Sequence, residues 1–415
     1  MFKSPRGTAD ILPEDQPYWR YIEGKAIEVC RRYGYQRVDT PVFEDAGLFT
    51  RSIGEGTDIV NKEMYVFCDQ SGNDLALRPE GTAPVCRAYI EHGMDNRPQP
   101  VKLYYLAAIF RYERPQAGRY RQHYQFGCEA IGDQSPALDA EVIDMAWNFF
   151  TGLGLKQLSL QINSIGCKVC RHQYLKTLKS YYADQVGGLC QDCQTRMDKN
   201  TLRLLDCKKP VCQQVADRAP SSSEHLCPEC SEHFEIVKQY LGLLGIPFRV
   251  NHRMVRGLDY YTKTVFELHP PEEASQSAMG GGGRYDNLIE ELGGKSTPAI
   301  GFATGMERIV LNLKKQNVAI PGLSKPKLFV ACMGNEAKLE AVKLVSRLRR
   351  QGISVLMTSG DKSLKAQLRQ ANSLSVEQVA ILGEDEVRNN EVTLRDMVTS
   401  EQKRVALDKI DEYLD

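Results

Sequence analysis

Arginines gather around two β-like runs in the stretch IFRYERPQAGRYRQHYQFGCEAIG (109–132). The loop between these runs and its base hold Arg111, Arg114, Arg119 and Arg121. A guanidinium group is planar, always charged and able to donate two parallel hydrogen bonds, which suits phosphate. Arg111 lies in an apolar run and therefore needs an anionic partner. The pattern predicts a phosphate-binding hairpin whose loop could contact a nucleic-acid end, and a solvated basic loop is the alternative.

A separate arginine, Arg256, opens the stretch RGLDYYTKTVFE (256–267). The run from Tyr260 onward is rich in β-branched and aromatic residues and predicts a strand. Because side chains alternate across a strand, we expect Tyr260 and Tyr261 on opposite faces, with the Tyr261 hydroxyl in a pocket. In GFATGMERI, Arg308 lies on a predicted helix behind a small-residue strand, where a nucleotide could lie close.

Acidic and amide side chains accompany these arginines. Gln125 and Glu129 are four residues apart in one β-like run and share a face, where they could bind an ammonium group and a ring N–H or form an ordinary polar face. Glu80 and Thr82 follow a strand in ALRPEGTAPVCR, so Glu80 could hold an amino group or serve a helix cap. The glycines of AMGGGGRYDNL allow either the close approach of a ligand or a hinge.

Cysteines form four closely spaced pairs: CKVC (167–170), CQDC (190–193), CKKPVC (207–212) and CPEC (227–230). The C-x₂-C spacing indicates zinc ligands, and buried reduced thiols are the alternative. The spacing does not fix which pairs cooperate. Because CKVC and CPEC each open an amphipathic helix, we expect one structural zinc ion on Cys167, Cys170, Cys227 and Cys230.

The composition is that of a globular protein of two or three domains, with 415 residues, 42% of them hydrophobic and 26% charged. Basic and acidic residues balance at 53 each, so any nucleic-acid site must be local. The sequence has no apolar run near ~18 residues and no apolar signal region at its N-terminus. We therefore expect no membrane association, a cytoplasmic location and reduced cysteines.

Several kinds of segment follow one another along the chain. Closely spaced β-like runs within 1–166 predict an antiparallel sheet with helices packed on it. Residues 167–245 are helical, polar and cysteine-rich and are predicted to form an insertion, after which β-like character returns over 246–321. Beyond a short Gly/Pro/Lys linker, strands and helices alternate over 326–415, which predicts a small α/β domain. The predicted fold class is therefore α+β with an added C-terminal α/β domain.

Taken together, these segments resemble the histidyl-tRNA synthetase family. RGLDYYTKTVFE and GGGGRYDNL resemble its two signature segments. FRYERPQAGRYRQHYQFGCEAIG and GFATGMERI resemble motifs 2 and 3 of the class II synthetases, and YGYQRVDTPVFED resembles motif 1. The opening RGTADILPED also fits, and 326–415 resembles the anticodon-binding domain, so the resemblance covers nearly the whole chain.

The resemblance implies a six-stranded antiparallel catalytic sheet, a homodimer built partly through motif 1, and a two-step reaction with ATP and Mg²⁺. Histidine would attack the α-phosphate of ATP to give histidyl-adenylate. The 3′-terminal adenosine of tRNA(His) would then accept the histidyl group. The cysteine segment varies within the family, so the zinc prediction rests on the cysteine spacing alone.

Functional positions of the family carry over residue by residue. Arg256 and Arg111 are the implied catalytic residues, because charge develops at the α-phosphate during attack. Gln116 and Arg121 would approach the tRNA acceptor end, and His123 stands where the commonest bacterial pattern has a phenylalanine that stacks on adenine. The positions implied to bind histidine are Glu80, Gly81, Thr82, Gln125, Glu129, Tyr260, Tyr261 and Tyr285, and those implied to bind ATP are Arg111, Arg119, His123, Arg256 and Arg308.

Two other functions are compatible with the same fold. A regulatory subunit of ATP phosphoribosyltransferase would be expected to lack the C-terminal domain and parts of RGLDYY or the motif 2 arginines. A tRNA-sensing module without chemistry would lack Arg111, Arg256 and Arg308. All of these features are present, so the sequence favours the ligase.

Overall fold

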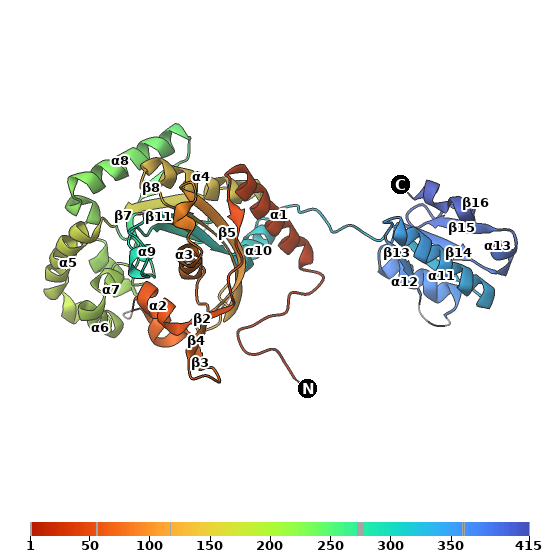
Figure 1. Cartoon of the computed structure of the whole chain (residues 1–415), viewed down its shortest axis with the longest axis horizontal. Coiled ribbons are helices and arrows are strands. Elements are labelled where there is room, and N and C mark those ends of the chain that lie inside the picture. The colour runs from red at the N-terminus through yellow and green to blue at the C-terminus, as the bar shows by residue number, and fades with distance from the viewer. Residues whose placement is uncertain are drawn as a thin grey trace. The chain divides into compact units, whose positions relative to one another are not determined.

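The computed structural model describes residues 2–54, 57–116, 118–271, 278–358, 360 and 362–414. The chain divides into two compact units, Met1–Pro321 and Gly322–Asp415, each with its own hydrophobic core (Figure 1). Within the described ranges, no helix is both long enough and apolar enough to cross a bilayer.

An eight-stranded sheet is the framework of the first unit, in the order β1-β5-β6-β11-β10-β9-β7-β8. The six inner strands pair antiparallel throughout, and the short edge strands β1 and β8 pair in parallel. The predicted antiparallel sheet of six strands is confirmed, with two edge strands added. The strands are β1 Gln36–Arg37, β5 Val101–Phe110, β6 Gln122–Ile131, β7 Ser159–Ser164, β8 Phe248–Val250, β9 Thr262–His269, β10 Gly280–Arg284 and β11 Ala299–Gly305.

The two faces of this sheet are covered differently, as the alternation along β6 shows. Phe126, Cys128 and Ala130 face a large apolar core, whereas Gln125 and Glu129 face the opposite side. The apolar core is closed by four helices, and the other face is partly covered by two shorter ones. These are α1 Gln16–Arg32, α4 Pro136–Gly152, α8 Pro228–Leu243 and α10 Met306–Lys315 on the core side, and α3 Thr82–Glu91 and α9 Leu288–Glu291 on the other.

The glycine run forms the central strand β10, and a hinge at this position is therefore excluded. Its residues 280–284 are all buried between β9 and β11. A Cβ atom on Gly282 would lie 1.9 Å from the carbonyl oxygen of Gly301 on β11. The run is therefore glycine because neighbouring backbone leaves no room for a side chain.

Two smaller parts attach to this sheet. A three-stranded sheet in the order β2-β4-β3 packs with helix α2 Ala46–Ile53 near the N-terminal part of the unit. The cysteine-rich segment forms helices that gather to one side of the main sheet (Figure 1). Their bounds, with those of the small strands, are β2 Phe43–Asp45, β3 Tyr65–Cys68, β4 Asp74–Leu77, α5 Lys168–Ala183, α6 Gln191–Lys199 and α7 Pro210–Ala216.

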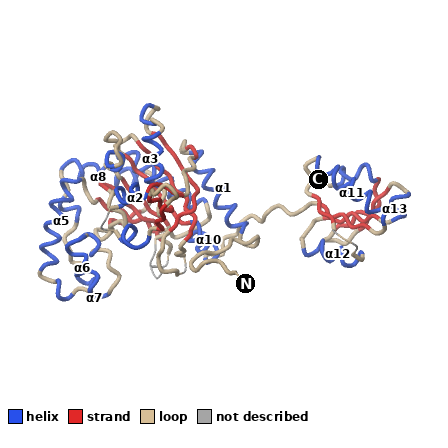
Figure 2. The backbone as a smooth tube through the Cα atoms, turned by 60° about the horizontal axis from the view of Figure 1, so that its bottom comes forward, coloured by secondary structure: helices blue, strands red, loops and turns tan. Residues whose placement is uncertain are grey.

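The second unit is a five-stranded sheet in the order β13-β12-β14-β15-β16, parallel for its first three strands and antiparallel for the rest. Helices α11 and α12 lie on opposite faces of this sheet (Figure 2). The predicted α/β domain with a partly parallel sheet is confirmed. Its elements are β12 Leu328–Cys332, α11 Asn335–Arg350, β13 Val355–Met357, α12 Leu364–Ser373, β14 Gln378–Leu382, α13 Glu384–Arg388, β15 Glu391–Asp396 and β16 Gln402–Ala406.

Candidate active site

A pocket of about 500 Å³ opens on the sheet face that carries Tyr105 and Gln125. Strands β5, β6, β9, β10 and β11 and the loop before β9 contribute to its lining. The structure brings together ten of the residues that the sequence singled out, from segments as far apart as the loop after β4 and helix α10. These are Glu80, Thr82, Arg111, Arg119, His123, Gln125, Arg256, Tyr260, Tyr261 and Arg308.

Glu80 lines the pocket and also serves the start of helix α3. Its two carboxylate oxygens accept hydrogen bonds from the backbone N–H groups of Thr82 (2.6 Å) and Ala83 (2.8 Å). Glu80 therefore serves the start of the helix, and because it also lines the pocket this role is compatible with binding an amino group. Burial raises the pKa of Glu80, although both N–H bonds favour the charged form. Gly81 lies against the Tyr105 ring, which an added Cβ atom would meet at 2.3 Å.

Glu129 lies behind Thr82, fully enclosed by its neighbours. The Thr82 hydroxyl donates to Glu129 Oε1 at 2.8 Å, and the Tyr285 hydroxyl donates to Glu129 Oε2. Burial raises the pKa of Glu129 to about 8, despite the opposing hydrogen bonds from Tyr285 and Thr82. A Cβ atom at position 301 would lie 1.9 Å from Oε2, so the glycine of β11 makes room for this carboxyl group.

Arg256 lies at the pocket wall beside β9. Its Nη1 donates to Glu267, and its guanidinium carbon is 5.5 Å from the centre of the Tyr261 ring. Among the described residues its Nε atom has no hydrogen-bond partner. Burial disfavours charge here, but Tyr261 and Glu267 outweigh burial and raise the pKa of Arg256. Burial also opposes the ionisation of Glu267, yet Arg256 and His269 bring the pKa of Glu267 to about 2.

Arg111, Arg119 and Arg308 form a second cationic group, which we call the arginine subsite. Arg111 Nε donates to the Pro79 carbonyl oxygen (2.7 Å), and Arg308 donates to the carbonyl oxygens of residues 118 and 278. Arg119 lies 3.4 Å from Glu113, and its buried Nε is unpartnered within the described ranges. Burial and the charge of Arg119 lower the pKa of Arg308. This excess of guanidinium groups is suited to an anion with several oxygens.

His123 and Glu307 border the arginine subsite. Burial, helped by Arg111 and Arg308, lowers the pKa of His123 to about 3, so its ring is neutral at physiological pH. Burial raises the pKa of Glu307 to about 7. Glu307 Oε1 accepts from the backbone N–H of Tyr124 at 2.9 Å, and Oε2 is without a partner in the part of the chain that the structure describes.

The prediction that Tyr260 and Tyr261 lie on opposite faces of a strand is wrong. Strand β9 begins at Thr262, and both tyrosines precede it in the chain, where the alternation of a strand does not apply. Their ring centres are 4.8 Å apart, and both line the pocket. Tyr260 also contacts the Tyr285 ring edge-on at 5.6 Å, which links the pocket lining to the Glu129 environment.

Gln116 and Arg121 lie on the loop between β5 and β6 and are not among the residues that line the pocket. The backbone of Gln116 pairs with Arg119, and the Arg121 guanidinium stacks 3.7 Å from the centre of the Tyr112 ring. Sequence reasoning missed Glu267 and His269, which both line the pocket. Their spacing of two residues on a strand could have placed both side chains on one face.

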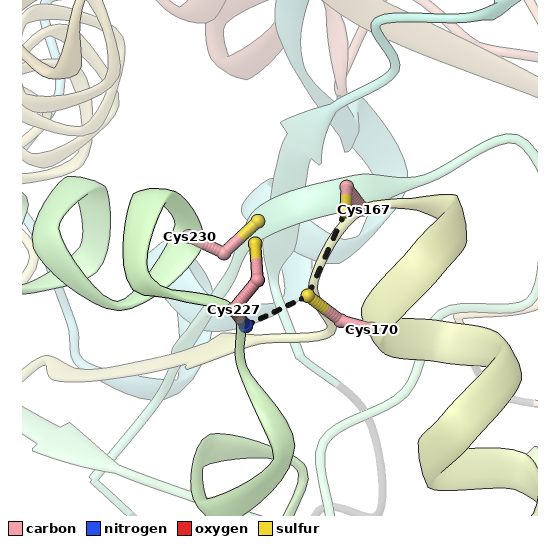
Figure 3. A group of neighbouring side chains, drawn as sticks. All are labelled: Cys167, Cys170, Cys227 and Cys230. Atoms are coloured by element: carbon pink, nitrogen blue, oxygen red, sulfur yellow. Dashed lines mark hydrogen bonds between the residues drawn. The ribbon is translucent and has the colours of Figure 1, made fainter.

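Two groups of four cysteines lie outside the pocket, each with its sulfur atoms within 4.8 Å of one another. The outer cysteine cluster contains the four predicted ligands, which converge from the starts of α5 and α8 (Figure 3). Its Cys167 and Cys170 sulfurs are 3.6 Å apart, and the backbone N–H of Cys227 donates to Cys170 Sγ at 3.0 Å. The inner cysteine cluster, which sequence reasoning did not assign, consists of Cys190, Cys193, Cys207 and Cys212.

Comparison with known proteins identifies the family of the chain. The family model for histidyl-tRNA synthetase matches residues 7–309, and the model for an anticodon binding domain matches residues 327–415. The chain belongs to the histidyl-tRNA synthetase family. A histidine–tRNA ligase from Dehalococcoides mccartyi is 59% identical over 410 residues, which cover 99% of this chain and 98% of that protein.

Solved structures agree with the family. The apo histidyl-tRNA synthetase of S. aureus matches with a TM-score of 0.84 and 39% identity, covering 100% of both chains. A Bacillus halodurans protein described as an ATP phosphoribosyltransferase regulatory subunit/histidyl-tRNA synthetase matches with a TM-score of 0.65 at 22% identity, over 92% of this chain and 97% of that one. That second match shows a shared fold alone, so the regulatory-subunit alternative is not favoured.

Proposed function

We propose that this chain activates L-histidine with ATP and transfers the histidyl group to the 3′ end of tRNA(His). The observation that carries the proposal is the pocket itself. It combines buried acceptors for an amino acid with an excess of arginines for a polyphosphate, in a member of the histidyl-tRNA synthetase family. A cytoplasmic location follows from the tRNA substrate.

The acidic side of the pocket is the histidine site in this proposal. Glu80, Thr82 and Gln125 hold the α-amino and carboxylate end of the amino acid. Glu129 and Tyr261 recognise the imidazole ring, with Tyr260 and Tyr285 supporting them.

The arginine subsite holds the phosphates of ATP, with Arg119 near the γ-phosphate and His123 under the adenine. The histidine carboxylate attacks the α-phosphorus, a P–O bond forms and pyrophosphate leaves. Arg256 and Arg111 stabilise the charge that develops on the α-phosphate oxygens, because fixed donors cost no reorganisation during the reaction. The Nε atom of Arg256, which has no partner in the part of the chain that the structure describes, supports this role.

Mg²⁺ enters this scheme with ATP, since it is usually held by phosphate oxygens and one or two carboxylates. Glu113 and Glu267 carry suitable oxygens and line the same pocket. The ion would neutralise phosphate charge and assist the departure of pyrophosphate.

Binding of tRNA is divided between the units in this proposal. Gln116 and Arg121 lie on the motif 2 loop and approach the acceptor end, and the C-terminal domain binds the anticodon region. The proposed boundaries are 1–166 and 246–321 for the catalytic domain, 167–245 for the insertion and 326–415 for the anticodon-binding domain. The family match to an anticodon binding domain over 327–415 supports the last of these.

A homodimer completes the assembly, with motif 1 in its interface. The small sheet that includes the end of motif 1 supports this because it leaves apolar side chains in solvent. Val42, Phe43, Val66 and Phe67 are between 43% and 52% exposed and lie close together, with the two phenylalanine ring centres 6.2 Å apart.

The outer cysteine cluster binds one structural zinc ion. Four thiolate ligands in a closed arrangement are typical of structural zinc. The backbone N–H bond to Cys170 supports this assignment, because a donor to a metal-bound sulfur orients that sulfur toward the metal.

Histidine-dependent exchange of pyrophosphate into ATP, followed by charging of tRNA(His), tests the proposed function. The purified protein should show both activities with histidine and neither with other amino acids. Absence of exchange from a folded, metal-sufficient protein would instead favour a regulatory or tRNA-sensing role.

A further inference from the structure

The inner cysteine cluster has the geometry of a second metal site. Tetrahedral zinc with Zn–S bonds of about 2.3 Å places its sulfur ligands about 3.8 Å apart. The Cys190 and Cys207 sulfurs are 3.8 Å apart, and all four sulfurs of the cluster lie within 4.8 Å of one another. The backbone N–H of Cys190 donates to Cys212 Sγ at 3.2 Å, as the N–H of Cys227 does to Cys170 in the outer cysteine cluster. Two unrelated pieces of sequence thus produce the same arrangement.

The part of the insertion that contains these cysteines has little else to hold it. Between α5 and α8 its helices contain nine residues or fewer, and several are single turns. Cys193, Cys207 and Cys212 are themselves members of its small apolar core. A unit of this size usually needs a disulfide or a metal to hold one conformation. These four cysteines form no disulfide within the described residues, so a bound metal is the remaining way to hold this part of the chain.

We infer that Cys190, Cys193, Cys207 and Cys212 bind a second structural zinc ion, independent of the one assigned to the outer cysteine cluster. The outer cysteine cluster joins the two ends of the insertion. The inner cysteine cluster fixes its distal part, through the start of α6 and the residues around α7.

This second ion also has a consequence for the active site. Leu205, Asp206 and Lys208 flank Cys207 and line the pocket. The Leu205 carbonyl accepts from Arg253 at 3.4 Å, and Asn200 donates to Asp259 of the RGLDYY segment at 3.0 Å. Coordination of the metal by Cys207 therefore fixes one wall of the pocket. The four cysteines position that wall and do not contact the reacting atoms.

Metal content of the full-length protein tests the inference. Wild type, expressed with sufficient zinc and purified under reducing conditions, should hold one zinc ion per cluster, two per chain. Cys193→Ser/Cys212→Ser should lose one ion and retain the other, and Cys170→Ser/Cys230→Ser should do the same through the outer cysteine cluster. The double variant Cys68→Ser/Cys332→Ser removes the same number of thiols outside both clusters and should keep both ions.

Cobalt substitution and kinetics distinguish this site from the outer one. The thiolate-to-Co²⁺ charge-transfer band of the inner-cluster variant should fall to half the wild-type intensity. Its KM for ATP or histidine should rise more than its kcat falls, because a pocket wall is loosened and the reacting groups are unchanged. Full zinc content in the inner-cluster variant would overturn the inference, whatever the outcome for the exchange activity.

Thiol alkylation of wild type decides the question if the variant fails to fold. The four inner-cluster cysteines should resist iodoacetamide until a strong chelator is added, as read by peptide mass spectrometry. Alkylation of these cysteines at the same rate with and without chelator, or their recovery as disulfides, would refute a metal site.

Discussion

Two arginines of the catalytic unit show how the same side chain is used in a structural junction and in a binding site. Arg284, at the end of β10, has an exposed fraction of 0%, and all three of its side-chain nitrogens donate hydrogen bonds. Arg256, at the pocket wall, donates to Glu267 but leaves its buried Nε unpartnered within the described residues. Both carry the same charge, but only Arg284 has a hydrogen-bond partner for each of its three side-chain nitrogens.

The Arg284 junction ties three elements together. Arg284 Nε donates to Asp139 of α4 at 2.6 Å, and Asp139 also contacts His233 of α8 at 2.8 Å. No ligand is needed to complete this network. In the pocket, by contrast, Arg256, Arg119 and Glu307 each keep a buried polar atom without a partner in the described part of the chain. Unpaired buried polar atoms are costly, so the presence of three in one cavity indicates a ligand that pairs them.

Breaking the junction should have the largest effect, and that effect should be on stability. Arg284→Met leaves Asp139 with one partner in a buried position, which should cost about 3–5 kcal/mol in the free energy of unfolding. Urea unfolding followed by circular dichroism measures this loss. The matched variant Arg284→Met/Asp139→Asn removes the uncompensated charge and should recover part of it. A loss well below about 1 kcal/mol for Arg284→Met would show that the network is not structural.

Changing the pocket arginine should affect the reaction and leave the fold intact. Arg256→Lys keeps the charge and the contact with Glu267 but loses the planar set of donors. Loss of one fixed donor to a developing oxyanion costs about 10²–10³ in rate. Histidine-dependent pyrophosphate exchange should fall by that factor with an unchanged melting temperature. A folded Arg256→Lys protein with near wild-type exchange would place Arg256 with Arg284 among the structural arginines.

The two arginines also show what sequence could and could not predict. Arg256, Arg111 and Arg308 were placed in one site because their motifs resemble those of one synthetase family, although only Arg308 lies within a regular helix or strand. Arg284 was not recognised as a structural residue, because its partners are 145 and 151 residues away in the chain. Tyr260 was assigned to the wrong face because the strand begins two residues later than its composition predicts.

The cysteine spacing led to the prediction of only one of the two cysteine clusters. The outer cysteine cluster was predicted correctly as a group of neighbouring side chains, since both of its pairs open helices. The inner cysteine cluster was overlooked because Cys207 and Cys212 depart from the C-x₂-C spacing. Four nested pairs could have indicated two sites, and only the folded chain shows which pairs meet.

Glu129, enclosed behind the pocket wall, offers a way to separate stability from activity. Glu129→Gln keeps the shape but cannot become an anion that accepts a ring N–H, so kcat/KM for histidine should fall roughly 10- to 100-fold. The pKa of Glu129 is raised from 4.5 to about 8 by burial, so the carboxyl group favours folding only when protonated. Relative to Glu129→Gln, the wild type should therefore lose stability as pH rises from about 4.5 to 8 and change little above that. If the melting temperatures of the two proteins change with pH in parallel over this range, the raised pKa of Glu129 is contradicted.

His123→Phe should have the smallest effect, because it exchanges one neutral ring for another. Burial and the neighbouring arginines lower the pKa of His123 to about 3, so the imidazole carries no charge at any pH where the enzyme is assayed. Phenylalanine adds apolar area against a purine, and aromatic contacts of this kind are worth about 0.5–1.5 kcal/mol. The KM for ATP should therefore fall by roughly two- to tenfold, with kcat nearly unchanged.

Because neither ring titrates, the profiles of KM for ATP against pH should run parallel for the two proteins. Free imidazole gains its proton below about pH 6.5. If the KM of the wild type changes in that range and the KM of His123→Phe does not, His123 is charged in the empty pocket. His123 would then act like Arg256, as a cation that binds the phosphates, and not as a neutral ring that contacts the adenine base.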